Sequence, residues 1–327
     1  MVDTQNNLIF HFLIQFINAI IKQLIQLILK IEGDFMKRII ILGLVLLLIV
    51  CITTAVSSCG CSKKVPKSLK ILAIGNSFSV DAMQYLYQIA ESAGVKEIVL
   101  GNLYIGGCSL ERHLKNAKEG ICDYKYYKNT NGEWTTTEYF SIDEGIKDED
   151  WDVITMQQSS GVSGIPESYE NTLTELIDFV NKEKTNGNAK LFWHMTWAYQ
   201  QDSTHASFPK YNSDQIQMYN MIVKTVQENV MVLDEIDGII PNATSIQNAR
   251  TSFLGDTLTR DGYHLDKEIG RYIAGLCYFA AITGADVSDI EYVPTDNISE
   301  KMRKLATSSV MDAVEKPYEI TPSKYKK

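Results

Sequence analysis

Three side chains in this sequence could together form a nucleophile and its activating base: Ser77, Asp261 and His264. Ser77 follows a run of apolar residues, 71–74, that predicts a buried strand, and Gly75 ends that run. A serine in a turn from strand to helix stands at the carboxyl end of a sheet, beside the free N–H groups of the helix, where a nucleophile is favoured. The same position also suits a serine that only caps the helix, and this stretch alone does not decide between the two.

Asp261 and His264 lie three residues apart in the segment DGYH, which predicts a turn at 261–265. That spacing lets the carboxylate reach the imidazole and fix its tautomer, so that the second ring nitrogen is free to face Ser77. The alternative is that Asp261 caps the following helix and His264 lies on the surface. The place of the pair, after the last crossover and before a long amphipathic helix, favours the functional interpretation.

Short apolar strands that alternate with amphipathic helices must position these side chains. Such alternation predicts an α/β domain with a parallel sheet covered by helices on both faces. We expect one domain over residues 69–327, with an inserted β-hairpin near 124–140, where an Asn-Gly pair lies between β-rich runs. The five predicted strands are 69–74, 97–104, 151–156, 190–195 and 238–240, and the main predicted helices are 81–92, 169–182, 213–228, 267–283 and 301–314.

Other unusual stretches fall at the predicted carboxyl ends of the strands, where the ligand crevice of a parallel sheet lies. The fold would bring these stretches, the serine turn and the 261–264 segment to the same edge of the sheet. Such clustering is expected of a site and not of a core. These stretches are Gly106-Gly107, Gln157-Gln158 and the segment from His194 onward.

The combination of motifs resembles the SGNH hydrolase superfamily, also called GDSL-like esterases. The segment GNSFS at 75–79 resembles its first block, GGCS at 106–109 its second and DGYH at 261–264 its last. The chain resembles more closely a bacterial domain family, DUF4886, over about residues 69–284. The stretches that carry this closer resemblance are 75–79, 101–111, 151–164, 193–200 and 246–264.

The resemblance implies a serine esterase built as a three-layer α/β/α sandwich around a five-stranded, flavodoxin-like parallel sheet. Carried over to this chain, it makes Ser77 the nucleophile, His264 the general base and Asp261 the carboxylate that orients the base.

The family's oxyanion hole combines three donors: the N–H of the serine, a glycine N–H of the second block and an asparagine side chain of the third block. Here the first two would be the N–H groups of Ser77 and Gly107. The third block departs from the family, because Gln157 and Gln158 stand where the asparagine is expected. A glutamine amide also donates hydrogen bonds. Gln158 is therefore the expected third donor, with Gln157 close behind.

Several further side chains could serve a site, and each has a structural alternative. His194 ends a predicted strand and is interpreted as a core or crevice-wall residue, and His113 is interpreted as structural. The aromatic stretch 124–139 either forms a wall for a sugar or packs the hairpin. Arg260 could steer an anionic substrate group, whereas Arg250 is expected to be solvated at the surface. Nothing in the sequence indicates a metal or another cofactor.

The N-terminal region predicts export and a lipid anchor. The letters MKR at 36–38 precede an apolar run, 39–50, and then VSSC at 56–59, an order typical of a secretory signal. The ending resembles a bacterial lipobox, so we expect a signal peptide over 36–58, lipidation at Cys59 and a linker over 59–68. An uncleaved membrane anchor is the alternative. Residues 1–35 are interpreted as a translation of DNA upstream of the natural start at Met36, and so not as part of the natural protein, or else as a membrane-associated helix.

Composition restricts the partners and leaves two classes of function. The chain has 327 residues and a net charge of −9 without a Lys/Arg cluster, which argues against nucleic acid as a partner. The first hypothesis is a serine ester hydrolase, lipid-anchored at the bacterial cell surface, that removes acetyl or other short acyl groups from carbohydrate or from small-molecule esters. The second is a carbohydrate-binding lipoprotein on the same fold whose chemistry has lapsed, and the missing asparagine motivates it.

Overall fold

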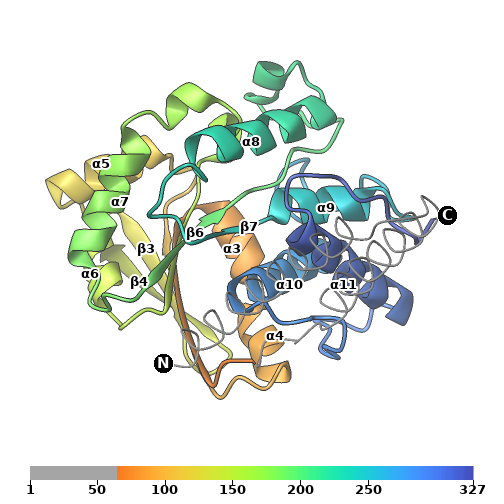
Figure 1. Ribbon diagram of the computed structural model, residues 1–327, viewed down its shortest axis with the longest axis horizontal. Coiled ribbons are helices and arrows are strands. Elements are labelled where there is room, and N and C mark those ends of the chain that lie inside the picture. Colours follow the sequence, from red (N-terminus) through yellow and green to blue (C-terminus); the bar gives the residue numbers. More distant parts are fainter. Residues whose placement is uncertain (1–64, 327) are drawn as a thin grey trace, which may run out of the picture. The chain divides into compact units, whose positions relative to one another are not determined.

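A computed structural model describes residues 65–326, which form a central sheet with helices on both sides (Figure 1). The sheet has seven strands in the order β4-β3-β2-β1-β5-β6-β7. The strands are β1 (Ser68–Gly75), β2 (Glu97–Tyr104), β3 (Tyr124–Asn129), β4 (Trp134–Phe140), β5 (Val153–Met156), β6 (Lys190–His194) and β7 (Gly238–Ile240). The helices are α3 (Ser77–Met83), α4 (Leu86–Ser92), α5 (Leu110–Glu119), α6 (Ile142–Lys147), α7 (Thr172–Glu183), α8 (Gln215–Asn229), α9 (Asn242–Arg250), α10 (Ile269–Thr283) and α11 (Glu300–Glu315).

Five strands are parallel to one another and lie in the order β2-β1-β5-β6-β7. Numbered along the chain, this order is 2-1-3-4-5, which is the flavodoxin-like arrangement that the sequence predicts. All of β5 and the last five residues of β1 are buried, as expected of strands covered on both faces. The order reverses direction at β1, so a crevice is expected beyond the carboxyl ends of β1, β2 and β5.

The predicted number of five strands is wrong, because the hairpin joins the sheet and does not stand apart from it. Strand β3 pairs antiparallel with β2, and β4 pairs antiparallel with β3, which brings the total to seven. The hairpin itself is confirmed at its predicted place. Its loop is closed by the Gly132 N–H, which donates to Asn129 Oδ1 at 2.8 Å, and Gly132 has the positive φ of 96° that favours glycine.

The helices form the two outer layers. Helices α5, α6 and α7 pack against one another on one side of the sheet, and α3, α4 and α10 pack together on the other (Figure 1). Helices α9 and α11 pack against α10 and thicken that second layer. The three-layer α/β/α architecture of the prediction is therefore observed.

Two helical segments differ from the prediction. The helix predicted over 81–92 begins earlier, at Ser77, and is interrupted between α3 and α4. It begins there because the Asn76 side chain accepts a hydrogen bond from the Phe78 N–H and so caps the helix. Helix α6 was not predicted, although Ser141 and Glu144 form a capping box, a pattern that is readable in the sequence.

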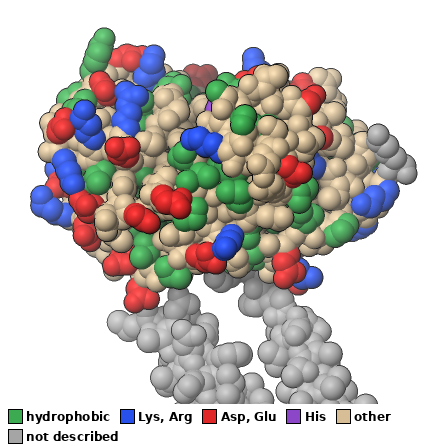
Figure 2. Space-filling model, turned by 90° about the horizontal axis from the view of Figure 1, so that it is seen from above, with side chains coloured by type: hydrophobic (Ala, Val, Ile, Leu, Met, Phe, Trp, Pro, Cys, Tyr) green, Lys and Arg blue, Asp and Glu red, His purple; other side chains and the backbone are tan. Residues whose placement is uncertain are grey.

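The predicted segments 1–35 and 36–58, together with Cys59, lie outside the described residues, as does most of the predicted linker 59–68. Within residues 65–326, no helix is both long and apolar enough to cross a membrane. On the face drawn in Figure 2, acidic and basic side chains are interspersed and do not gather by sign.

Candidate active site

Ser77 is the first residue of α3, directly beyond the carboxyl end of β1. The turn that carries it is tight. A β-carbon on Gly75 would lie 2.4 Å from Ser79 Oγ, so only glycine lets the strand pass this close to the helix. Ser79 is itself buried and donates to Asn102 Oδ1 at 2.9 Å, which ties the first turn of α3 to β2. The sequence thus places the Ser77 hydroxyl on a rigid corner of the sheet.

Asp261, His264 and Ser77 form one hydrogen-bonded line. His264 Nδ1 lies 2.7 Å from Asp261 Oδ2, and His264 Nε2 lies 2.8 Å from Ser77 Oγ. Since a carboxylate only accepts, Nδ1 carries the proton in the neutral ring and Nε2 accepts from the serine hydroxyl. The structure therefore brings together the three side chains that the sequence singles out, in the order and tautomer that a serine nucleophile requires.

Asp261 is held in its charged form. Burial opposes ionisation, but hydrogen bonds from the His264 side chain and from the backbone N–H groups of His264 and Tyr263 outweigh it, so the pKa of Asp261 lies below its usual value. A carboxylate that stays charged stabilises the imidazolium that forms when His264 takes the serine proton.

The loop 259–265 that carries this pair is fixed at several points. Its neck is closed by the Arg260 N–H, which donates to the His264 carbonyl at 2.9 Å. The loop after β6 supports it from outside, because Trp197 Nε1 donates to the Tyr263 carbonyl at 2.7 Å and the Gln200 N–H donates to the Gly262 carbonyl at 2.8 Å. Trp197, which the sequence analysis did not single out, therefore helps to place the candidate base.

A second glycine-containing turn, 105–108, lies close to the serine turn. Its Cys108 carbonyl accepts from Asn76 Nδ2 at 3.1 Å, so the residue before Ser77 binds the two turns together. Gly107 has a φ of 62° and is exposed. Among residues 65–326, no partner is found for the N–H of Ser77 or of Gly107, so both are free to bind an oxyanion.

The expectation that Gln158 supplies the third oxyanion donor does not fit its contacts. Gln158 Nε2 donates to the carbonyl and hydroxyl oxygens of Ser168 at 2.9 and 3.1 Å, and its Oε1 accepts from the Leu110 N–H. Gln157 Nε2 donates to Asn76 Oδ1 at 2.8 Å. Both side chains are buried. The two N–H groups of the Gln158 amide are used on Ser168, which corrects the prediction that Gln158 is the third donor, whereas one Gln157 N–H is used on Asn76.

Gln157 belongs to a buried chain of polar side chains that crosses the carboxyl edge of the sheet. Its Oε1 accepts from His194 Nδ1 at 2.7 Å, and Asn242 Nδ2 lies 3.0 Å from His194 Nε2. The chain Asn76–Gln157–His194–Asn242 thus links the ends of β1, β5, β6 and β7. Burial lowers the pKa of His194 to about 3, so its ring stays neutral and can keep both bonds.

The other predicted candidates are structural or are paired. His113 is buried on α5, and its Nδ1 lies 2.8 Å from the Tyr124 hydroxyl, as the structural interpretation requires. The expectation that Arg250 is solvated is wrong, because its side chain is 3% exposed and pairs with Asp256. Arg260 pairs with a buried carboxylate and does not point freely toward a substrate.

An aromatic tract continues from His264 toward the surface. The Tyr263 ring lies 4.2 Å from the His264 ring, and the His205 ring lies 4.7 Å from that of Tyr263. His205 and Tyr263 are only half-buried, so they border the entrance to the triad. His205 accepts from the Ser207 N–H through Nδ1, which leaves Nε2–H as a donor at this rim. No sequence motif marks His205, and only the fold brings it here.

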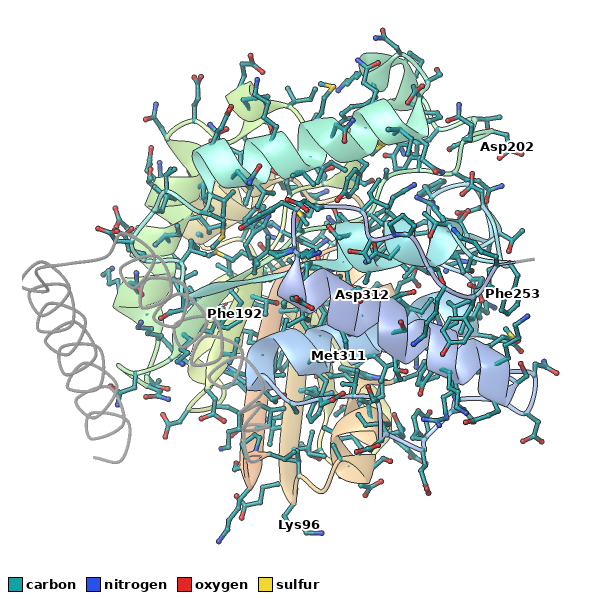
Figure 3. All side chains as sticks on the ribbon, turned by 45° about the vertical axis from the view of Figure 1, so that its right-hand side comes forward. Lys96, Phe192, Asp202, Phe253, Met311 and Asp312 are labelled. Atoms are coloured by element: carbon teal, nitrogen blue, oxygen red, sulfur yellow. The ribbon has the colours of Figure 1, made fainter. Side chains whose placement is uncertain are left out.

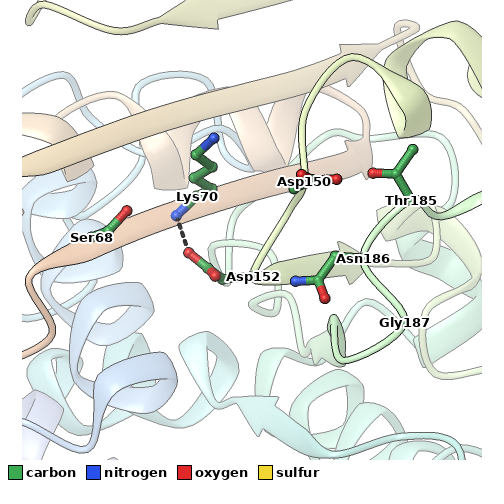
Figure 4. Close-up of a pocket in the computed structure, with 7 residues that line it drawn as sticks. All are labelled: Ser68, Lys70, Asp150, Asp152, Thr185, Asn186 and Gly187. Atoms are coloured by element: carbon green, nitrogen blue, oxygen red, sulfur yellow. Dashed lines mark hydrogen bonds between the residues drawn. The ribbon is translucent and has the colours of Figure 1, made fainter.

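The opposite edge of the sheet holds none of these groups. An open cavity at the amino ends of β1 and β5 is lined by Lys70, Asp150 and Asp152 among others, and the Lys70 N–H donates to Asp152 Oδ2 at 2.8 Å (Figure 4). Its lining contains no histidine or cysteine and no predicted site residue. Figure 3 shows the same separation, with Lys96 at the amino end of the strands and Asp202, in the loop after β6, far from it.

Comparisons with known proteins identify the family of this chain. The family model described as "Domain of unknown function (DUF4886)" matches residues 70–313. The chain belongs to the DUF4886 family. A crystal structure of a DUF4886 family protein from Bacteroides uniformis is 41% identical to this chain, covers 78% of it and 97% of its own length, and gives a TM-score of 0.75. The family recognition made from the sequence is confirmed.

More distant structures are also similar. A protein from Slackia heliotrinireducens, described as "a putative SGNH hydrolase", is 17% identical, with 66% of this chain and 99% of that chain covered and a TM-score of 0.42. An α/β hydrolase from the metagenome of Lake Arreo is 10% identical, with 68% and 98% covered and a TM-score of 0.43. No curated protein is significantly similar to the chain.

Proposed function

We propose that this member of the DUF4886 family is a serine ester hydrolase, with Ser77 as nucleophile, His264 as general base and Asp261 as its orienting carboxylate. The observation that carries the proposal is the continuous line from Asp261 through His264 to Ser77, with contacts of 2.7 and 2.8 Å. The alternative, that the serine only caps its helix, does not apply, because the Asn76 side chain caps α3.

The proposed reaction has two steps. Ser77 Oγ attacks the ester carbonyl carbon while His264 Nε2 takes the hydroxyl proton, and the N–H groups of Ser77 and Gly107 face the oxyanion that forms. The intermediate collapses as His264 protonates the departing alcohol, which leaves an acyl group on Ser77. A water molecule, activated by the same nitrogen, then hydrolyses this acyl-enzyme and releases the acid.

We propose short acyl groups on carbohydrate as the substrate. The rim beside the triad supports this choice, because His205 and Tyr263 combine aromatic surface with hydrogen-bonding groups, as a binding site for a polar alcohol would. The signal-peptide pattern and Cys59 support placement of the enzyme outside the cytoplasm on a lipid anchor, where polysaccharide is accessible.

The rival function is a carbohydrate-binding protein whose catalysis has lapsed. One observation supports it: both glutamines of the third block are buried and donate within the protein, and the Gln158 amide has no N–H left for an oxyanion. The intact triad geometry weighs against it, and two backbone donors remain for the oxyanion.

Active-site labelling with a fluorophosphonate distinguishes these functions. The wild type should be labelled and should hydrolyse p-nitrophenyl acetate faster than long-chain p-nitrophenyl esters, whereas Ser77→Ala should do neither. Ser160→Ala, which changes another half-buried serine whose hydroxyl lies 2.9 Å from that of Tyr199, is the matched control and should still be labelled. An unlabelled, inactive wild type that binds acetylated polysaccharide would favour the rival function.

A further inference from the structure

Asp81 is a buried carboxylate in the same short helix as Ser77, one turn further along. Its side chain is 1% exposed and is surrounded by donors. Arg260 Nη1 lies 3.1 and 3.0 Å from its two oxygens, Arg271 Nε donates at 2.8 Å, and the Leu265 N–H donates at 3.0 Å. A carboxylate offers roughly four acceptor positions, so these contacts satisfy it fully.

The partners of Asp81 bracket the candidate catalytic loop. Arg260 directly precedes Asp261, and Leu265 directly follows His264, so one carboxylate holds the loop at both ends. Arg271 comes from α10 and fixes the same carboxylate from behind, with its Nη2 2.7 Å from Asp81 Oδ1. Helix α3, which carries the nucleophile, and the loop, which carries the base, are therefore joined through Asp81.

Burial decides which contacts hold the loop. The side chains of His264 and Asp261 are 18% and 40% exposed, so water competes for their mutual contact, and such pairs contribute little to stability. Asp81 is excluded from water, so water does not compete for its contacts, and loss of one arginine would leave the buried carboxylate with fewer donors, which is unfavourable. The triad bonds alone are thus poorly suited to fix the distance between His264 and Ser77, whereas the Asp81 contacts are well suited.

We infer that Asp81, with Arg260 and Arg271, is a positioning group that sets the His264–Ser77 distance. This inference rests on the proposed function. Asp81 touches no reacting atom and lies behind the catalytic loop, so its contribution is to keep the base within hydrogen-bond reach of the nucleophile. Misplacement by about 1 Å can cost about a hundredfold in rate, so such a clamp has a large effect on turnover.

The test is Asp81→Asn, which keeps the shape of the side chain and removes its charge. For p-nitrophenyl acetate we expect kcat to fall by about tenfold to a hundredfold per folded molecule, with KM changed less than about twofold. Fluorophosphonate labelling of Ser77 should slow by a similar factor. Hydrogen exchange of the backbone over 256–268 should accelerate, because the loop has lost its anchor.

The matched control is Asp148→Asn. Asp148 is a partly buried carboxylate that accepts from Lys128 and from the Tyr126 hydroxyl at 2.7 Å. It directly follows α6 and contacts β3, and it is far from the loop along the chain. This variant should leave kcat and the exchange of 256–268 unchanged. If Asp81→Asn does not fold, Arg271→Lys replaces it, because lysine keeps the charge and loses the two-point contact, and it should give a smaller fall in kcat.

A folded Asp81→Asn or Arg271→Lys protein with wild-type kcat, or with unchanged exchange over 256–268, overturns the inference. A fall in activity that merely follows the fraction of unfolded protein overturns it as well. An inactive wild type would instead refute the proposed function, and the exchange measurement would still report whether Asp81 anchors the loop.

Discussion

Replacement of His194 by glutamine should make the protein less sensitive to acid. Burial lowers the pKa of His194 to about 3 in the folded protein, against about 6.5 in an unfolded chain. As the pH falls below 6.5, His194 binds a proton in the unfolded chain but stays neutral in the folded protein. The stability that this neutral histidine contributes is therefore complete above pH 6.5 and is lost progressively down to about pH 3.

The size of the effect follows from the two pKa values. A pH of 5 lies about 1.5 units below the pKa of histidine in the unfolded chain. At about 1.4 kcal/mol per unit, protonation of the unfolded chain therefore lowers the free energy of unfolding by about 2 kcal/mol. Glutamine does not titrate and can still donate to Gln157 Oε1. The variant should therefore lose about 2 kcal/mol less of its unfolding free energy than the wild type between pH 8 and pH 5.

Urea unfolding at both pH values and constant ionic strength measures this difference. His113, whose pKa is also lowered to about 3 by burial, should behave in the same way in His113→Gln. His205→Gln is the control, because that histidine is only half-buried and should carry less of the effect. If the wild type and His194→Gln lose the same free energy, His194 is not held neutral by burial, and the interpretation of the buried polar chain is wrong.

Three further outcomes are expected. Asp261→Asn should lower kcat by about three to four orders of magnitude in p-nitrophenyl acetate hydrolysis while circular dichroism stays native, because it removes the group that fixes the His264 tautomer. Gln157→Ala should lower kcat about tenfold or more, because Asn76 loses its support. Gln158→Ala should instead lower the unfolding free energy by about 1–3 kcal/mol and leave kcat within about threefold of the wild type, and the reverse pattern would restore Gln158 as an oxyanion donor. Metabolic labelling with a fatty-acid analogue should mark the wild type and not Cys59→Ala, and equal labelling of both would contradict the lipobox interpretation.

The strands of the sheet were predictable because each is a short apolar run that ends in glycine, proline or polar residues. The predicted bounds of β2 and β7 match the structure, and the flavodoxin-like order follows from the family resemblance. The Asn-Gly turn predicts the hairpin. Its pairing with β2 was not predictable, because no local sequence pattern determines which edge of a sheet a hairpin joins.

Within the site, Ser77, Asp261 and His264 were predictable because the chemistry dictates their types and a motif fixes their spacing. The roles of Gln157, Asp81 and Arg250 were not predictable, since each depends on a partner that is distant in sequence. A buried arginine or glutamine differs from a solvated one only in what the fold places beside it. From the sequence, Arg250 is therefore expected at the surface, and Gln158, with Gln157 close behind, is expected at the oxyanion.

The hairpin has a consequence for association between copies of this protein. Without β3 and β4, the outer edge of β2 would be left with unpaired backbone N–H and C=O groups along the mostly apolar segment 98–103, and such an edge is a template for pairing with another chain. Strand β3 covers it, and the outermost strand, β4, carries three threonines and a glutamate and is largely exposed. Two hydrogen bonds tie the hairpin to α4 and the residues before it: the Trp134 indole N–H donates to the Gln84 carbonyl, and the Gln88 side-chain amide donates to the Gly132 carbonyl. Removal of residues 124–140 should therefore produce a chain that self-associates through β2, because the hairpin covers the edge of the parallel sheet that could otherwise pair with another copy.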